Sequence, residues 1–150
     1  MIFEVVPNKF RKFPNEQIKL PIRSTSKSAG YDFFSNEDYV LEPGENHTFW
    51  TDIRISLVWN QFLMIVPRSS LAIFKNVTVT NSPGIVDADY YNNVSNGGNI
   101  GISLLNRGNK SIIINKGERI AQGIILEYKR ILNEEEARNK RKGGFGSTGD

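Results

Sequence analysis

The two-residue period of its apolar side chains is the feature of this sequence that most restricts its fold. Isoleucine or leucine recurs on one parity of residues 53–57, 100–104 and 120–126. Short apolar runs at 62–66 and 111–114 indicate buried strands. Because successive side chains of a strand point to opposite faces of a sheet, this spacing predicts strands rather than helices.

Turn-forming residues separate these segments at short intervals. Strands spaced roughly 8–12 residues apart are typical of an all-β sandwich or barrel. A chain of 150 residues suits one such domain. A small β domain leaves exposed sheet edges, which favours oligomerisation. The turn signals are Glu42-Pro43-Gly44, Ser82-Pro83-Gly84, Asn96-Gly97-Gly98, Arg107-Gly108-Asn109 and Lys116-Gly117.

Cysteine and histidine are nearly missing from the chain, which has no cysteine and one histidine, His47. Disulfides, thiolate nucleophiles and cysteine-based zinc sites are excluded, and at most one imidazole is left for a metal site or a catalytic triad. We expect His47 to be a surface residue. An enzyme built from this chain would rely on carboxylates, hydroxyls, backbone amides, basic side chains and a hard metal ion.

Charged residues lie near both ends of the chain. No apolar run approaches the ~20 residues of a membrane span, and Glu4 and Lys9 come too early for a signal peptide. Three glutamates at 134–136 precede four basic residues within 138–142, which form either a solvated linker or an anion-binding tail. Residues 143–150 contain four glycines and are expected to form a flexible arm.

Three segments carry groups suited to phosphate chemistry, and each also has a plainer interpretation. Asp87 ends an apolar strand, either as an ordinary exit into a turn or as a general base that holds a water. Residues 67–72 are either a turn with Arg68 in an ion pair, or a phosphate site made of a guanidinium, a hydroxyl and turn amides. The tail 143–149 is either a plain terminus or an arm whose single Phe145 ring stacks on a flat ligand.

Together these segments resemble the trimeric deoxyuridine triphosphatases (dUTPases). All five ordered motifs of that family occur in sequence order. One such string could arise by chance, whereas five in order over most of the chain are specific. The motifs lie at 29–33, 67–72, 81–90, 117–122 and 143–149.

The resemblance implies an all-β dUTPase-like fold, a β-sandwich or jelly-roll barrel over residues 1–133, followed by a charged linker and glycine-rich lid over 134–150. Family members are homotrimers with shared active sites. They hydrolyse dUTP to dUMP and pyrophosphate by in-line attack of water on the α-phosphorus, which keeps uracil out of DNA and supplies dUMP for dTMP synthesis. We therefore expect a cytoplasmic enzyme with Mg²⁺ as cofactor.

The resemblance also implies roles for individual residues. Asp87 matches the carboxylate that positions and deprotonates the water, and Gln122 matches a side chain that organises that water and the α-phosphate. Ser69 would contact the oxygen between the α- and β-phosphates, where leaving-group charge develops. Asp32 matches a carboxylate that touches the waters of a phosphate-bound Mg²⁺, an outer-sphere contact. The implied phosphate-binding residues are Arg68, Ser69, Ser70, Gln122, Lys140, Arg141, Gly146, Ser147 and Thr148.

The third and fifth motifs supply the implied nucleoside site. Tyr90 would lie flat against the deoxyribose and leave no room for a 2′-hydroxyl. Phe145 would stack over the uracil when the arm closes. The residues implied to bind uracil or deoxyribose are Asn81, Gly84, Val86, Asp87, Tyr90, Ile100 and Phe145.

Two departures from the family pattern matter. Residues 91–97 are inserted at the tip of the uracil-reading hairpin, and Asn99 stands where glutamate is common. We expect the hydrophilic insert to lengthen the hairpin into solvent; the alternative is a surface for a protein partner. In the fifth motif Lys140 stands where arginine is usual. Arg141 is preferred for the γ-phosphate because its guanidinium is bidentate, with Lys140 as the alternative.

Three other function classes compete with this interpretation. A dCTP deaminase shares the fold but usually lacks the glycine-rich arm. A nucleotide-gated interaction protein would use the insert at 91–97. A nucleic-acid-binding module is weaker, because the basic stretch is short and lacks interleaved aromatic residues. We expect dUTP as the substrate, and neither a membrane nor a nucleic acid as partner.

Overall fold

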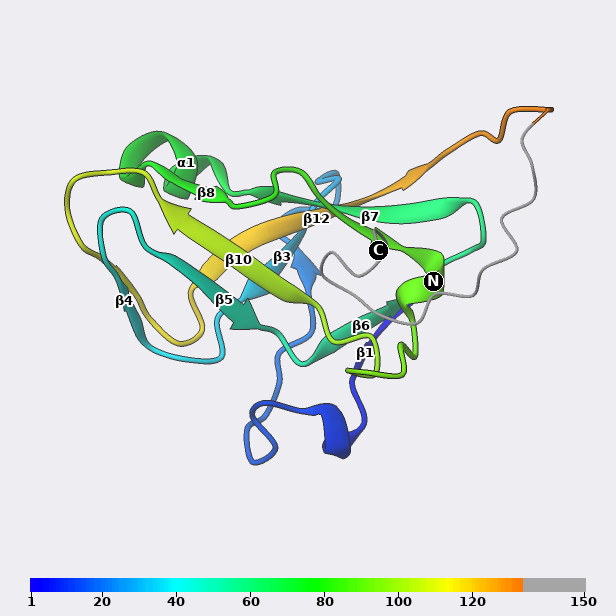
Figure 1. The fold of residues 1–150 in the computed structure, drawn as a ribbon, viewed down its shortest axis with the longest axis horizontal. Helices are drawn as coiled ribbons and strands as arrows, with labels where there is room; N and C mark the ends of the chain where they lie inside the picture. Colours follow the sequence, from blue (N-terminus) through cyan, green and yellow to red (C-terminus); the bar gives the residue numbers. More distant parts are fainter. Residues whose placement is uncertain (134–150) are drawn as a thin grey trace.

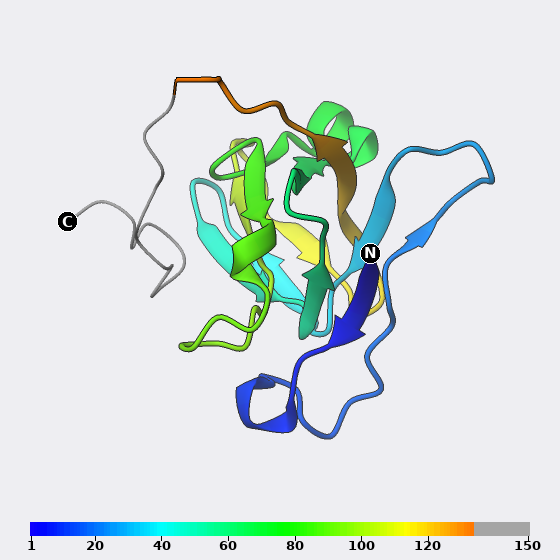
Figure 2. The ribbon, with the colours of Figure 1, turned by 90° about the vertical axis from the view of Figure 1, so that its right-hand side faces the viewer.

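The structure, a computed structural model, describes residues 1–133, and most of its regular secondary structure is short strands (Figures 1 and 2). All pairings between the described strands are antiparallel. The expected all-β fold class is therefore confirmed. The linker and lid expected at 134–150 lie outside the described residues, so their boundary stays a prediction.

The largest sheet contains five strands in the order β2-β3-β12-β7-β9. Its central strand β12 places Gln122 opposite Asp32 of β3 on one side and opposite Val66 of β7 on the other. The strands of this sheet span Ile22–Arg23 (β2), Tyr31–Phe34 (β3), Arg119–Glu127 (β12), Gln61–Pro67 (β7) and Gly84–Asp87 (β9).

A second sheet has the order β5-β10-β8, and two strand pairs, β1-β6 and β11-β4, complete the fold. Figure 1 shows β5 and β10 crossing over β3 and β12. The elements span Ile2–Val5 (β1), Asn8–Phe10 (η1, a 3-10 helix), Tyr39–Leu41 (β4), Asn46–Trp50 (β5), Ile53–Ser56 (β6), Val77–Val79 (β8), Ala88–Tyr90 (η2, a 3-10 helix), Gly101–Asn106 (β10) and Ile112–Ile114 (β11).

The core lies between the two larger sheets. Leu63 and Ile65 of β7 and Ile102 and Leu104 of β10 belong to one buried apolar cluster. Their sequence neighbours are less buried, as the period-two spacing predicts. The expected strands at 62–66 and 100–104 are therefore confirmed.

Strand β12 departs from the expected single parity. Its register against β3 shifts between Arg119 and Ala121, as at a β-bulge, which inserts an extra residue and reverses the facing of those that follow. Ile120 is fully buried, but beyond the shift it is Ile125 that packs on the core, while Leu126 is 37% exposed. The prediction that one parity runs through the segment is wrong beyond the bulge.

One helix, α1 (Ser69–Lys75), stands where the sequence suggested a turn. It follows β7 directly, buries Leu71, and ends at Asn76 in the left-handed conformation (φ 56°). Arg68 at its N-cap position makes no side-chain capping bond, so the usual sequence signal for a helix start is missing. Within residues 1–133, no helix has the length and apolar content to cross a membrane.

His47 is half-buried, contrary to the expectation of a plain surface residue. Its ring stacks on Tyr39 with centroids 3.6 Å apart. Its Nε2 lies 3.1 Å from Oε1 of Glu37. The histidine is thus part of an aromatic and acidic cluster at the β4–β5 end of the fold.

Candidate active site

A polar pocket of about 470 Å³ gathers residues from distant parts of the chain. β3, α1 with the residue before it, and β12 supply them, together with the loop before β3. The residues predicted to bind phosphate or metal that meet here are Asp32, Arg68, Ser69, Ser70 and Gln122.

The centre of the polar pocket is the carboxylate of Asp32, which is only 5% exposed. Its Oδ1 lies 3.3 Å from Nε of Arg68, and its Oδ2 lies 3.4 Å from Nη1 of Arg119. The hydroxyl of Ser24 donates a hydrogen bond of 2.6 Å to Oδ2. Both oxygens are thus engaged, and the Arg68 guanidinium is held at the pocket by a buried partner.

Gln122 enters this pocket because β3 and β12 are in register. Directly opposite residues of an antiparallel pair point to the same face, so Gln122 and Asp32 share it. Gly30 lies so near that a Cβ on it would stand 2.4 Å from Oε1 of Gln122. Only glycine therefore leaves the Gln122 amide where it is.

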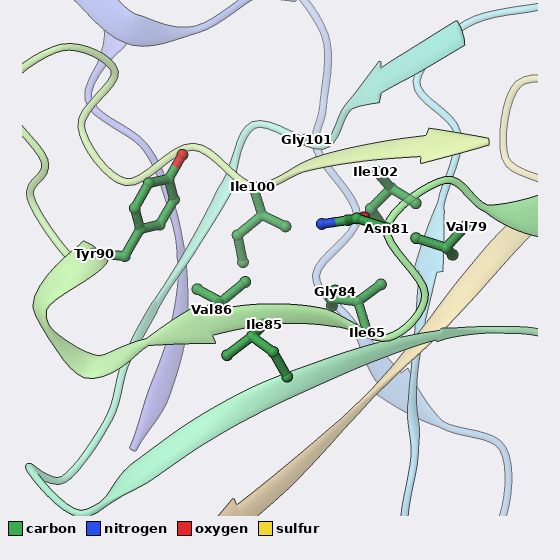
Figure 3. A pocket seen from close by; sticks show the side chains of 10 residues that line it. All are labelled: Ile65, Val79, Asn81, Gly84, Ile85, Val86, Tyr90, Ile100, Gly101 and Ile102. Atoms are coloured by element: carbon green, nitrogen blue, oxygen red, sulfur yellow. The ribbon is translucent and has the colours of Figure 1, made fainter. Parts of the chain in front are cut away.

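A second pocket, of about 150 Å³, forms where β7, β8, β9 and β10 meet (Figure 3); it is called the apolar pocket because most of its lining side chains are aliphatic. A cavity of about this size can hold a single six-membered ring. It contains five of the residues predicted to bind uracil or deoxyribose, Asn81, Gly84, Val86, Tyr90 and Ile100. In Figure 3, Tyr90 stands at one end of the pocket and Asn81 toward the other, with Val86 and Ile100 between them.

Tyr90 is held by the burial of its ring and by two hydrogen bonds at its hydroxyl. It is 6% exposed, and its ring lines the apolar pocket. Its hydroxyl donates to the backbone oxygen of Asn99 at 3.0 Å and accepts from Nδ2 of Asn96 at 2.6 Å. The ring is therefore fixed before any ligand arrives.

Asp87, the predicted general base, lies apart from the polar pocket. It ends β9, opposite Phe62 of β7, and is exposed. It is not among the residues that line the polar or the apolar pocket. One described chain therefore does not bring this carboxylate to the residues predicted to bind phosphate.

The insert at 91–97 folds back onto the protein, so the expectation of a hairpin lengthened into solvent is wrong. Within the insert Asn93 and Gly97 are buried. The Tyr91 hydroxyl donates to Oε2 of Glu4 at 2.6 Å. Short polar side chains that bond their own loop make this compact shape possible, for example Asn93 Oδ1, which accepts from the Ser95 backbone N–H at 3.0 Å.

Sequence reasoning missed Ser24, Ser28 and Arg119. Arg119 lies inside the fourth motif, and its positive charge is a signal from which a role at the site could have been predicted. Ser24 and Ser28 carried no signal, because their place depends on the loop that leads into β3. The predicted residues Lys140, Arg141, Phe145, Gly146, Ser147 and Thr148 lie outside the described residues.

Known proteins are similar to this chain in sequence and in fold. A family model described as dUTPase matches residues 16–149. The deoxyuridine 5'-triphosphate nucleotidohydrolase of Clostridium tetani is 41% identical over 145 residues, covering 92% of this chain and 94% of the relative. The protein of that name from Lactococcus lactis is 36% identical over 148 residues, covering 98% and 96%. The solved structure of a Streptococcus mutans dUTPase is similar with a TM-score of 0.74 and 29% identity, covering 86% of this chain and 97% of that one. The chain therefore belongs to the dUTPase family.

Proposed function

We propose that this protein hydrolyses dUTP to dUMP and pyrophosphate. The observation that carries the proposal is the pair of pockets on one scaffold. One is polar, with the Arg68 guanidinium fixed by Asp32. The other is apolar, sized for one ring and bounded by Tyr90 and Asn81. A nucleoside triphosphate has one part suited to each, and the nucleotidohydrolase relatives act on such a substrate.

In this mechanism water attacks the α-phosphorus in line. The new bond joins the water oxygen to the α-phosphorus, the bond to the α,β-bridging oxygen breaks, and Asp87 takes the proton. Ser69 contacts the bridging oxygen, on which charge develops. Arg68 and Gln122 orient the α-phosphate. Pyrophosphate leaves, and dUMP remains.

Mg²⁺ is the proposed cofactor and would neutralise the phosphate charge before attack. Among residues 1–133, no group of three or more histidine, cysteine, aspartate or glutamate side chains could hold a metal ion. This fits an ion carried by the substrate phosphates, with the protein touching only its waters. The Asp32 carboxylate accepts hydrogen bonds from Ser24 and Arg119 and is ion-paired with Arg68. With about four lone-pair sites, it keeps acceptor capacity for such a water.

A homotrimer with shared sites belongs to the same proposal. It is supported by the position of Asp87, outside the pocket where Arg68 and Gln122 meet. It is also supported by Phe74, which lines that pocket and is 83% exposed in the single chain. A second subunit that brings its own Asp87 to this pocket would complete the site and cover the ring.

The proposal extends to a lid, a protein partner and a cellular location. Residues 134–150 would close over the nucleotide, with Phe145 on the uracil and Arg141 or Lys140 on the γ-phosphate; truncation after Lys142 should then strongly reduce turnover. A partner of the insert at 91–97 would have the exposed Asn92, Val94 and Ser95 to contact. A cytoplasmic location is part of the same proposal.

A single assay tests the proposed reaction. Pyrophosphate release is measured with dUTP, dCTP, dTTP and UTP, each with and without Mg²⁺. We expect release from dUTP only, and dependence on Mg²⁺. Ammonia is measured in the same dCTP reaction, and its release would instead identify a deaminase and overturn the proposal.

A further inference from the structure

The loop that follows Tyr90 is tied to the N-terminal segment by buried polar side chains. Asp52 and Asn99 are fully buried, and Oδ1 of Asp52 accepts from Nδ2 of Asn99 at 2.8 Å. These residues are 47 positions apart in sequence. A buried hydrogen bond between a carboxylate and an amide is strong, and it is costly to leave half made.

Asp52 collects donors from the N-terminal segment on the same carboxylate. The backbone N–H groups of Lys12 and Phe13 donate to Oδ1 and Oδ2, each at 2.8 Å. Arg11 adds an ion pair at 3.6 Å. Asp52 itself is in the left-handed conformation with φ 55°, which few residues other than glycine, asparagine and aspartate adopt easily.

Asn99 connects Asp52 to Tyr90 through hydrogen bonds. Its side chain donates to Asp52 and to the backbone oxygen of Phe10, the latter at 3.3 Å. Its own backbone oxygen accepts the Tyr90 hydroxyl at 3.0 Å. The position of that oxygen, and with it the position of the ring, is therefore set from the N-terminal segment.

Close packing also restricts the loop that follows Tyr90. A Cβ on Gly97 would stand 2.3 Å from Cδ2 of Phe10, so the Phe10 ring lies directly against the loop. A Cβ on Gly98 would stand 2.8 Å from the backbone oxygen of Tyr90, at φ +82°. The loop thus has little freedom to move away from the tyrosine while the N-terminal segment stays in place.

We propose that Asp52 and Asn99 are positioning residues that hold the Tyr90 ring where it rejects a ribose 2′-hydroxyl. This inference rests on the proposed function. Neither side chain touches the substrate; they act through the Asn99 carbonyl. A ring that is loosened at its hydroxyl end leaves room for the extra oxygen, so selectivity should suffer before chemistry does.

The test is the ratio of kcat/KM for dUTP to that for UTP. In Asn99→Ala we expect this ratio to fall about tenfold, with a raised KM for dUTP and little change in kcat. Asp52→Asn should act in the same direction, because asparagine accepts the left-handed conformation but presents one acceptor oxygen instead of two. Should Asn99→Ala fail to fold, Asp52→Asn carries the test.

Asn106→Ala is the matched control for lost stability. Asn106 is also a fully buried asparagine, bonded to the backbone oxygens of Leu41 and Lys110 at 2.9 Å, but it lies at the far end of β10 from the apolar pocket. We expect it to lower the melting temperature and leave the dUTP-to-UTP ratio unchanged. An equal fall of the ratio in this control would overturn the inference.

A double-mutant cycle separates positioning from an independent effect. Tyr90→Phe keeps the ring and removes the hydroxyl that reaches Asn99. If the two act in series, Asn99→Ala combined with Tyr90→Phe lowers the ratio no further than Tyr90→Phe alone. Additive losses, or an unchanged ratio in Asn99→Ala, overturn the inference and leave the proposed function intact. A wild-type protein that does not hydrolyse dUTP overturns both.

Discussion

Asp32 and Gln122 stand directly opposite each other on the antiparallel strands β3 and β12, and both face the polar pocket. The first and fourth motifs are thus brought together by strand register alone. The bulge at the start of β12 lies just before Gln122 and helps to set this register. The chemistry of the pocket therefore depends on backbone features that are not themselves reactive.

The first prediction concerns Gly30. In Gly30→Ala the new Cβ would stand 2.4 Å from Oε1 of Gln122, so the amide must move. We expect kcat for dUTP to fall at least about tenfold, while the melting temperature changes little, because only the end of a flexible side chain shifts. Steady-state kinetics and thermal unfolding measure the two. Gly108→Ala, away from the pocket, should retain activity, and equal losses in both would contradict the prediction.

The second prediction concerns the buried carboxylate at the polar pocket. Asp32→Asn removes the anion that holds Arg68 and Arg119. We expect kcat/KM to fall about a hundredfold. We expect the free energy of unfolding to drop by about 2 kcal/mol, because Arg119 is partly solvated and the loss of its ion pair costs little. Pyrophosphate release and denaturant unfolding test this. Glu118→Gln, which breaks the exposed pair with Lys75, serves as the control and should change both quantities little.

The third prediction separates binding from chemistry at Asp87. Asp87→Asn keeps the size of the side chain but removes the proposed base. We expect affinity for dUTP to persist while kcat falls by about a thousandfold. Calorimetric titration and single-turnover kinetics measure the two. The neighbouring Asp89→Asn is the matched control and should turn over normally. An unchanged kcat in Asp87→Asn would show that another group takes the proton.

Local pattern was sufficient for much of the fold. The spacing of isoleucines predicts β6 and β10, because one face of each strand is buried and the other is not. Local pattern did not predict α1, a helix that buries Leu71 and has no side-chain capping bond. It also did not predict the contacts just after the insert, where Asn99 donates to a carboxylate 47 residues away. Local sequence carries no record of such distant contacts.

The candidate site, like the fold, was only partly predictable from the sequence. The motif resemblance named Asp32, Arg68 and Gln122, which the fold brings to one pocket. It did not indicate that Asp32 is bonded to Ser24 and Arg119, because these contacts follow from the path of the loop before β3. Residue identity is thus visible in a motif, whereas the partners that orient the residue depend on the tertiary structure.

The last prediction concerns stability in acid. The Tyr39 hydroxyl donates to Oε1 of Glu45, and this bond, with the Glu42 backbone N–H on Oε2, lowers the pKa of the Glu45 carboxyl below its ordinary 4.5. A lowered pKa means that the folded protein prefers the ionised form more than the unfolded chain does. The resulting stabilisation is complete above pH 4.5 and is lost as the pH falls through the lowered pKa.

Glu45→Gln isolates this contribution, because the amide keeps the size of the side chain and an acceptor for Tyr39 but does not titrate in this range. We expect the variant to melt below the wild type at neutral pH, and the gap to shrink as the pH falls from about 5 to about 3. Thermal unfolding of both proteins across that range gives the gap directly, and the many other carboxylates cancel in the difference. A gap that stays constant with pH would show that the interaction does not depend on the charge of Glu45.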